Sequence, residues 1–197
     1  TLPRQAPGFI YEVPVKALTM RHPQVREAIR GTVAALAEPC IVEHILQLGV
    51  DTVELMPLAA WIDERHLSPL GLANAWGYNP VTFLAPDPRL APGGMAEVRE
   101  TVGKLHAAGL RVVLDVVLNH SGESDAAGAT LSLRGLDNAL YYRHDGEHRL
   151  VNDTGCGNTL ALDRPPVLRL AMDALRHWAS ATGLDGFRFD LATVMGR

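Results

Sequence analysis

Apolar residues along the chain follow two patterns that alternate, one with the period of a helix and one nearly continuous. Helical spacing occurs in three stretches: Ile41, Ile45 and Leu48, with Val42 and Leu46 beside them; Met95, Val98, Val102 and Leu105; and Leu168, Ala171, Leu175 and Trp178. Nearly continuous apolar runs occupy residues 9–18, 50–58 and 111–120, and another begins at Leu184. These runs predict strands, and Pro14 marks the first of them as an edge strand. Residues 19–38 are expected to be a polar and Ala-rich connection.

Each predicted helix passes to the next strand through the same short junction. The junctions are Leu48-Gly49-Val50, Ala108-Gly109-Leu110 and Thr182-Gly183-Leu184. Glycine readily takes the left-handed conformation that ends a helix. Helices that alternate with strands apolar on both faces predict a parallel sheet covered by helices.

The connections from strand to helix are long, at about residues 59–94 and 121–166. Sites in α/β folds lie at the carboxyl ends of the strands. We therefore expect the functional side of the molecule to carry these two long loops.

Two opposite charges lie in the last predicted strand, Gly186 to Leu191. Arg188 and Asp190 share one face by strand alternation, and this strand is expected to be buried. A buried charge is costly unless it is paired, so Arg188 would keep Asp190 ionised. An ionised carboxylate at a strand end suits a nucleophile, whereas a structural ion pair is the alternative, and these residues alone do not decide between them.

The preceding strand places an acid in an apolar run. Asp115 and Asn119 share a face by parity, and an acid in such surroundings needs a strong partner, for which Arg188 is the candidate. His120 ends this strand and is either functional or a structural helper. Tyr78 lies in a loop on the functional side, where it would stack on a sugar ring or fill the core.

Composition narrows the function. The net charge is −4 with no run of Lys or Arg, which argues against nucleic-acid and membrane-surface partners. Cys40 and Cys156 lie far apart without CxxC spacing, so no disulfide framework or zinc site is expected, and a reducing, cytoplasmic compartment fits. No apolar run reaches the length of a membrane span. Residues 1–4 lack the signal-peptide pattern, and the chain does not begin with Met, so it is expected to be a piece of a longer protein.

Several motifs in order resemble the α-amylase superfamily of glycoside hydrolases, which are (β/α)₈-barrel enzymes. The superfamily marks are Asp115-Val116-Val117-Leu118-Asn119-His120 and Gly186-Phe187-Arg188-Phe189-Asp190. A narrower likeness, to bacterial glycogen debranching enzymes and isoamylases, rests on residues 76–80, 134–138, 141–142, 154–159 and 189–197. One departure lies in strand one, where the family usually has Glu-x-His-Val-(Lys/Arg)-Gly and this chain has Glu12-Val13-Pro14-Val15-Lys16-Ala17.

The resemblance implies an α/β fold in which residues 1–197 are one partial catalytic domain, a partial (β/α)₈ TIM barrel of about strands one to four. It implies hydrolysis of α-1,6 branch links in branched α-glucans by a retaining mechanism. Asp190 would be the nucleophile, Arg188 would orient it and Asp115 would brace Arg188. His120 would hydrogen-bond the sugar next to the cut, and Tyr78 would stack on that sugar.

The resemblance also bears on cofactors and partners. No cofactor is expected: Asn119 matches a calcium ligand of some amylases, but acidic partners for calcium are not evident in the sequence. The family's acid/base Glu follows strand five, beyond Arg197, so the chain alone is expected to have little or no activity. Strands one and four would be open edges, which favours self-association or a partner that supplies the other half.

Two alternatives stay open. One is a relative that acts on α-1,4 links or forms trehalose, and the other is a non-catalytic glucan-binding module. The loop motifs after strands two and three favour debranching, and the presence of both Arg188 and Asp190 disfavours a decayed site.

Overall fold

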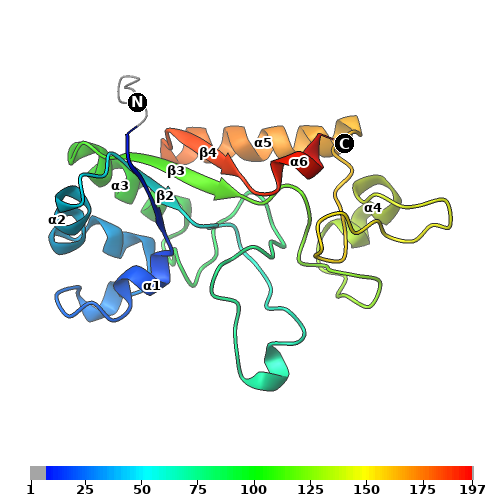
Figure 1. The fold of residues 1–197 in the computed structure, drawn as a ribbon, viewed down its shortest axis with the longest axis horizontal. Helices are drawn as coiled ribbons and strands as arrows, with labels where there is room; N and C mark the ends of the chain where they lie inside the picture. Colours follow the sequence, from blue (N-terminus) through cyan, green and yellow to red (C-terminus); the bar gives the residue numbers. More distant parts are fainter. Residues whose placement is uncertain (1–7, 197) are drawn as a thin grey trace. The chain divides into compact units, whose positions relative to one another are not determined.

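The computed structural model of this chain describes residues 8–196, so residues 1–4, which lack the signal-peptide pattern, lie outside the described residues. Strands and helices alternate along the chain (Figure 1). The strands are β1 (Ile10–Val13), β2 (Thr52–Leu55), β3 (Arg111–Val116) and β4 (Gly186–Phe189). The α-helices are α1 (Val15–Thr19), α2 (Pro39–Gln47), α3 (Gly94–Ala107), α4 (Leu133–Tyr141), α5 (Pro165–Thr182) and α6 (Ala192–Met195), and short 3-10 helices span Glu27–Ile29, Val33–Ala37 and Ser68–Leu70.

The four strands form one sheet in the order β1-β2-β3-β4. β1 pairs with β2 and β2 with β3 in parallel, so that Val53 lies opposite both Tyr11 and Val112. β4 also runs parallel to β3. The backbone N–H of Asp185 donates to the Val112 carbonyl, and the N–H of Asp190 donates to the Val116 carbonyl. The α/β class is confirmed, and the sheet is that of a partial (β/α)₈ barrel. β1 and β4 are its edge strands within the described residues.

The residues divide into two compact units. The first unit comprises the residues up to Leu58, Ala85–Asp115 and His177–Arg188. The second unit comprises Ala59–Leu84, Val116–Arg176 and the residues from Phe189 onward. Each unit is described below by itself.

The core of the first unit lies between the strands and two helices. Three of the four residues of the predicted stripe in α3 are buried, Val98, Val102 and Leu105, whereas Met95 in the first turn is half-buried. In α2, Ile41 and Ile45 are buried, but Leu46 and Leu48 are exposed. The helix ends at Gln47, and Leu48 is its C-cap, so the expected inward position of Leu48 is wrong.

The repeated glycine junction is confirmed. Gly49, Gly109 and Gly183 have φ values of +72°, +85° and +80°. L-residues with a side chain rarely adopt this conformation, which explains why the chain places glycine at all three helix ends.

The strands are shorter than the apolar runs that predicted them. β1 stops at Val13 because Pro14 has no N–H for the sheet, and the residues after it begin α1. β2 and β3 end at Leu55 and Val116, and β4 begins at Gly186 rather than at Leu184. Beyond the last residue of β1, β2 and β3 the backbone no longer pairs with the neighbouring strand, and the chain continues outside the sheet.

Two burial expectations are wrong. β4 is not buried: Arg188 and Phe189 are exposed, because only β3 pairs with this edge strand among residues 8–196. Leu168 in α5 is also exposed. The buried stripe of that helix instead consists of Val167, Ala171, Ala174 and Trp178, spaced four, three and four residues apart.

The segments expected to be irregular contain short helices. α4 lies inside the 121–166 loop, and 3-10 helices occur in the 19–38 connection. None of the helices within residues 8–196 combines the length and the apolar character needed to cross a lipid bilayer.

Candidate active site

The first unit contains the expected ion pair between β3 and β4. Nη1 of Arg188 lies 3.0 Å and 2.9 Å from the two carboxylate oxygens of Asp115. The Asp115 side chain is fully buried, whereas 44% of the Arg188 side chain is exposed. Arg188 therefore neutralises a buried acid and still reaches solvent, and it is the partner expected for an acid in an apolar run.

More acids share this face of the sheet. Glu12 and Glu54 lie directly opposite each other on β1 and β2. Burial raises the pKa of the Glu54 carboxyl, and the charges of Asp115 and Glu12 raise it further, while Arg188 lowers it. The first unit thus gathers more negative than positive charge on this face.

The raised pKa of Glu54 predicts that Glu54→Gln stabilises the chain at neutral pH. At pH 7 burial and repulsion by neighbouring acids penalise the charged Glu54 carboxylate, and the neutral amide of Gln avoids this penalty. Below the ordinary pKa of about 4.3 the carboxyl is protonated in both the folded and unfolded states, so the gain disappears. Urea unfolding of the 197-residue chain at pH 7 and at pH 5 should show the larger gain at pH 7. The exposed Glu43 on α2 is the control, and an equal gain from Glu43→Gln would contradict the argument.

The second unit holds Asp190 through Asn119. Nδ2 of Asn119 donates to the Asp190 carbonyl at 2.9 Å and to the Asp190 carboxylate at 3.1 Å. The Asp190 N–H donates to the Val116 carbonyl at 3.1 Å. The backbone and the carboxylate of Asp190 are therefore held by the last residue of β3 and by Asn119, which follows it.

The same amide holds His120. Nδ1 of His120 lies 2.5 Å from Oδ1 of Asn119, and Nε2 lies 2.8 Å from the Tyr78 carbonyl. Burial lowers the pKa of the His120 imidazole, and the Tyr78 carbonyl, Asp190 and Glu64 offset part of this effect. Only 1% of His120 is exposed, so a ring nitrogen can reach a sugar only by exchanging one of these two hydrogen bonds. Its predicted contact with substrate stays a prediction.

Asn119 is the residue of this site whose contacts the sequence did not indicate. Strand alternation placed Asn119 on the same face as Asp115, and the motif matched it to a residue that binds calcium in some amylases. Both groups of its side chain instead bond within the protein. Among residues 8–196, no group of three or more His, Cys, Asp or Glu side chains is placed to hold a metal ion.

Asn119→Ala tests this positioning role. We expect kcat of the complete gene product that contains these residues to fall by about 10²-fold, with little change in KM, because the Asp190 carboxylate loses its orientation. Steady-state kinetics of the complete gene product would measure both constants. Asn138→Ala, which removes an amide in α4, is the matched control. A rise in KM at unchanged kcat would contradict a positioning role.

A cavity of about 930 Å³ opens in the second unit. Tyr78 lines it together with Glu64, Asp125 and Cys156, whereas none of the other four predicted site residues does. Burial raises the pKa of the Cys156 thiol, so this cysteine reacts more slowly than an exposed one at neutral pH. The structure thus joins Tyr78, His120 and Asp190 in the second unit, and Asp115 with Arg188 in the first.

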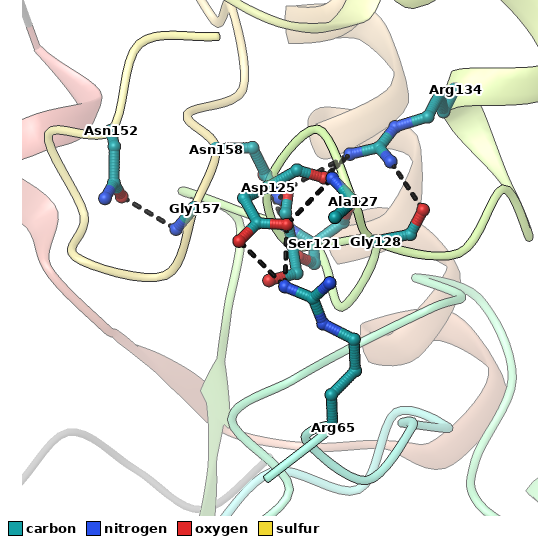
Figure 2. A network of polar contacts seen from close by, with 10 residues as sticks. Arg65, Ser121, Asp125, Ala127, Gly128, Arg134, Asn152, Gly157 and Asn158 are labelled. Carbon is teal, nitrogen blue, oxygen red and sulfur yellow. Dashed lines mark hydrogen bonds and ion pairs between the residues drawn. The ribbon is translucent and has the colours of Figure 1, made fainter.

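One wall of this cavity is the loop around Asp125, which side-chain hydrogen bonds hold in place (Figure 2). Arg65 donates to both carboxylate oxygens of Asp125 at 2.7 Å. Arg134 donates to the carbonyls of Ser124, Asp125 and Gly128, and Asn158 bonds the N–H and the carbonyl of Ser121. A polar framework therefore fixes the loop shape.

Glycine is required at one point of this wall. A Cβ atom at Gly157 would lie 2.5 Å from the Asp125 backbone nitrogen, and φ at Gly157 is +98°. No other residue fits both constraints. This explains the second glycine of the Thr154–Thr159 motif.

The N-terminus of α4 is bonded by a buried acid, Glu123. Its carboxylate accepts from the backbone N–H groups of Leu131, Ser132 and Arg134 at 2.8–2.9 Å, and from the Tyr142 hydroxyl. Burial alone raises the pKa of the Glu123 carboxyl, but these four hydrogen bonds outweigh burial and leave the pKa lowered. Glu123 thus orders the second half of the long loop.

Comparison with known proteins gives close relatives over nearly the whole chain. The chain is 51% identical over 193 residues to a glycogen debranching enzyme of Klebsiella pneumoniae and 47% identical to one of Yersinia enterocolitica. Each match covers 95% of this chain and 29% of the relative, so the chain spans about 29% of the length of these proteins. No protein-family model matches the chain.

Solved structures agree with these relatives. A pullulanase from Paenibacillus barengoltzii, in complex with maltohexaose and α-cyclodextrin, has a TM-score of 0.80 at 30% identity, over 94% of this chain and 31% of that chain. A type I pullulanase from Bacillus subtilis has a TM-score of 0.81 at 28% identity, over 99% of this chain and 30% of that one. The resemblance found in the sequence motifs, to the α-amylase superfamily and most closely to glycogen debranching enzymes, is confirmed.

Proposed function

We propose that this relative of bacterial glycogen debranching enzymes and pullulanases is part of a glycoside hydrolase that cleaves α-1,6 branch links in branched α-glucans. The observation that carries the proposal is the 51% identity to a glycogen debranching enzyme over 95% of the chain. The activity belongs to the complete gene product, in which these residues supply one of two catalytic carboxylates.

In this proposal Asp190 is the nucleophile of a retaining mechanism. Its carboxylate attacks the anomeric carbon, the bond to the leaving oxygen breaks, and a covalent glycosyl-enzyme forms. The acid/base Glu that the resemblance places after strand five protonates the leaving oxygen and then activates the water that releases the sugar. Hydrogen bonds from Asn119 support this role, because they hold the Asp190 carboxylate in one orientation.

The other predicted residues have supporting roles. Arg188 has the orienting role that the resemblance implies, and the buried Asp115 fixes Arg188 through the two short contacts between them. Tyr78 stacks on the sugar from the cavity wall, and His120 bonds the same sugar. Cys40 and Cys156 are free thiols, which fits the proposed cytoplasmic location.

The test is an assay of the complete gene product on glycogen limit dextrin and on unbranched amylose. We expect linear oligosaccharides from the branched glucan, little cleavage of amylose, and products released with the α configuration. Cleavage of amylose at a similar rate would instead favour an α-1,4-acting relative. The 197-residue chain alone should release little or no reducing sugar, since the resemblance places the acid/base Glu after strand five.

The edge strands support one further part of the proposal. β1 and β4 are unpaired on their outer sides within residues 8–196, so we expect the isolated chain to self-associate. Sedimentation of a single species at 21.3 kDa would contradict this expectation.

A further inference from the structure

Glu64 lies in the wall of the 930 Å³ cavity, and one of its carboxyl oxygens has no hydrogen-bond partner among residues 8–196. Its Oε1 atom accepts a hydrogen bond from Nδ2 of Asn74 at 2.8 Å. Its Oε2 atom is buried and has no hydrogen-bond partner among residues 8–196. A carboxyl oxygen in this position lacks the hydrogen-bond partner that buried polar groups require.

Asn74 connects Glu64 to the turn that carries Tyr78. Oδ1 of Asn74 accepts from the backbone N–H groups of Trp76 and Gly77, both at 2.9 Å. The Asn74 N–H donates to Asp63 at 2.9 Å. Glu64 and the Trp76–Tyr78 turn therefore form one preorganised piece of the cavity wall.

The cavity favours a neutral ligand rich in hydroxyl groups. Glu64 and Asp63 would repel an anion, and Arg65, the neighbouring cation, is engaged with Asp125. A hydroxyl group supplies the donor that Oε2 lacks, and the carboxylate rotates easily about its last torsion to meet it. The aromatic ring of Tyr78 on the same wall suits a sugar ring.

We propose that Glu64 is a glucan-binding residue that accepts a hydroxyl hydrogen bond from a glucose unit in this cavity, with Asn74 as the residue that positions it. The inference rests on the proposed function for the identity of the ligand. It adds a specificity residue that none of the sequence motifs indicated. A neutral polar side chain at position 64 should weaken sugar binding without any effect on the chemical step.

The experiment uses the complete gene product with Asp190→Asn, which stops turnover, and maltotriose as the probe. Isothermal titration should show binding that Glu64→Gln weakens by about 10-fold to 100-fold, because the amide presents a donor where an acceptor is needed. Asn74→Ala should weaken binding in the same direction. Glu147→Gln, an exposed acid outside this cavity, should leave affinity unchanged.

A second readout is independent of heat signals. Cys156 lines the same cavity, so bound maltotriose should slow its alkylation, and Glu64→Gln should raise the maltotriose concentration needed for protection. Equal affinity of the Glu64→Gln and parent proteins, or no maltotriose binding at all, would overturn the inference. Sugar binding that depends on Glu64, in a protein that cleaves no branched glucan, would refute the proposed function and leave this inference standing.

Discussion

The Asp190→Asn variant of the complete gene product is expected to hydrolyse branched glucan at least about 10⁴-fold more slowly than the parent protein. An amide is a very poor nucleophile, so no glycosyl-enzyme forms. The variant should still fold, because the amide oxygen of Asn can accept the hydrogen bond from Asn119 that the carboxylate accepts now. The loss should therefore appear in kcat rather than in stability.

Two measurements separate this result from general damage. Rapid quenching with a slowly released substrate, followed by mass spectrometry, should detect a glycosyl adduct on the parent protein and none on Asp190→Asn. Asp173→Asn on α5, an exposed acid paired with Arg176, is the matched control and should keep full activity. Activity of Asp190→Asn within tenfold of the parent would rule out the nucleophile role.

The second large effect is on stability. Glu123→Ala should lower the free energy of unfolding of the 197-residue chain by about 3–5 kcal/mol. The change removes the acceptor of three backbone N–H groups at the start of α4 and leaves the Tyr142 hydroxyl with Ser121 alone. Urea unfolding measures the loss, and Glu147→Ala provides a matched surface control.

The contribution of Glu123 should depend on pH in a defined direction. Its folded-state pKa is lowered, so its stabilisation is fully present above the unfolded-state pKa of about 4.3 and is lost as pH falls through the folded-state value. The difference between parent and Glu123→Ala should thus be constant from pH 7 to about pH 5 and shrink at lower pH. A difference that grows on acidification would contradict the assigned hydrogen bonds.

Features with a local cause could be predicted from the sequence. The stripe of α3 follows from its apolar spacing, and the three helix ends follow from glycine's freedom at positive φ. The contact between Arg188 and Asp115 followed from the cost of an unpaired acid in an apolar strand. These inferences need only neighbours in sequence or on an adjacent strand.

Features that depend on distant contacts could not be predicted. The start of α4 is fixed by Glu123, ten residues before the helix, and no pattern of spacing announces that contact. The exposure of β4 depends on which strands pair with it. In α5 the buried stripe contains Val167 and Ala174, each one residue before the leucine that the apolar spacing predicted. The free oxygen of Glu64 is visible only once every donor around it is placed.

The backbone just after Asp190 has a consequence for evolution and engineering. Leu191 has φ of +43°, a left-handed conformation that costs a branched residue about 1–2 kcal/mol. The Asn119 side-chain amide donates to the carbonyl of Asp190, the residue before Leu191, and this hydrogen bond helps to hold the conformation. Selection for heat resistance alone would favour glycine at position 191, which adopts positive φ without strain. The backbone there would then be more flexible, and the Asp190 carboxylate would be held less firmly in one orientation. The thermal tolerance and the catalytic rate of the complete protein are therefore expected to trade against each other at this single residue.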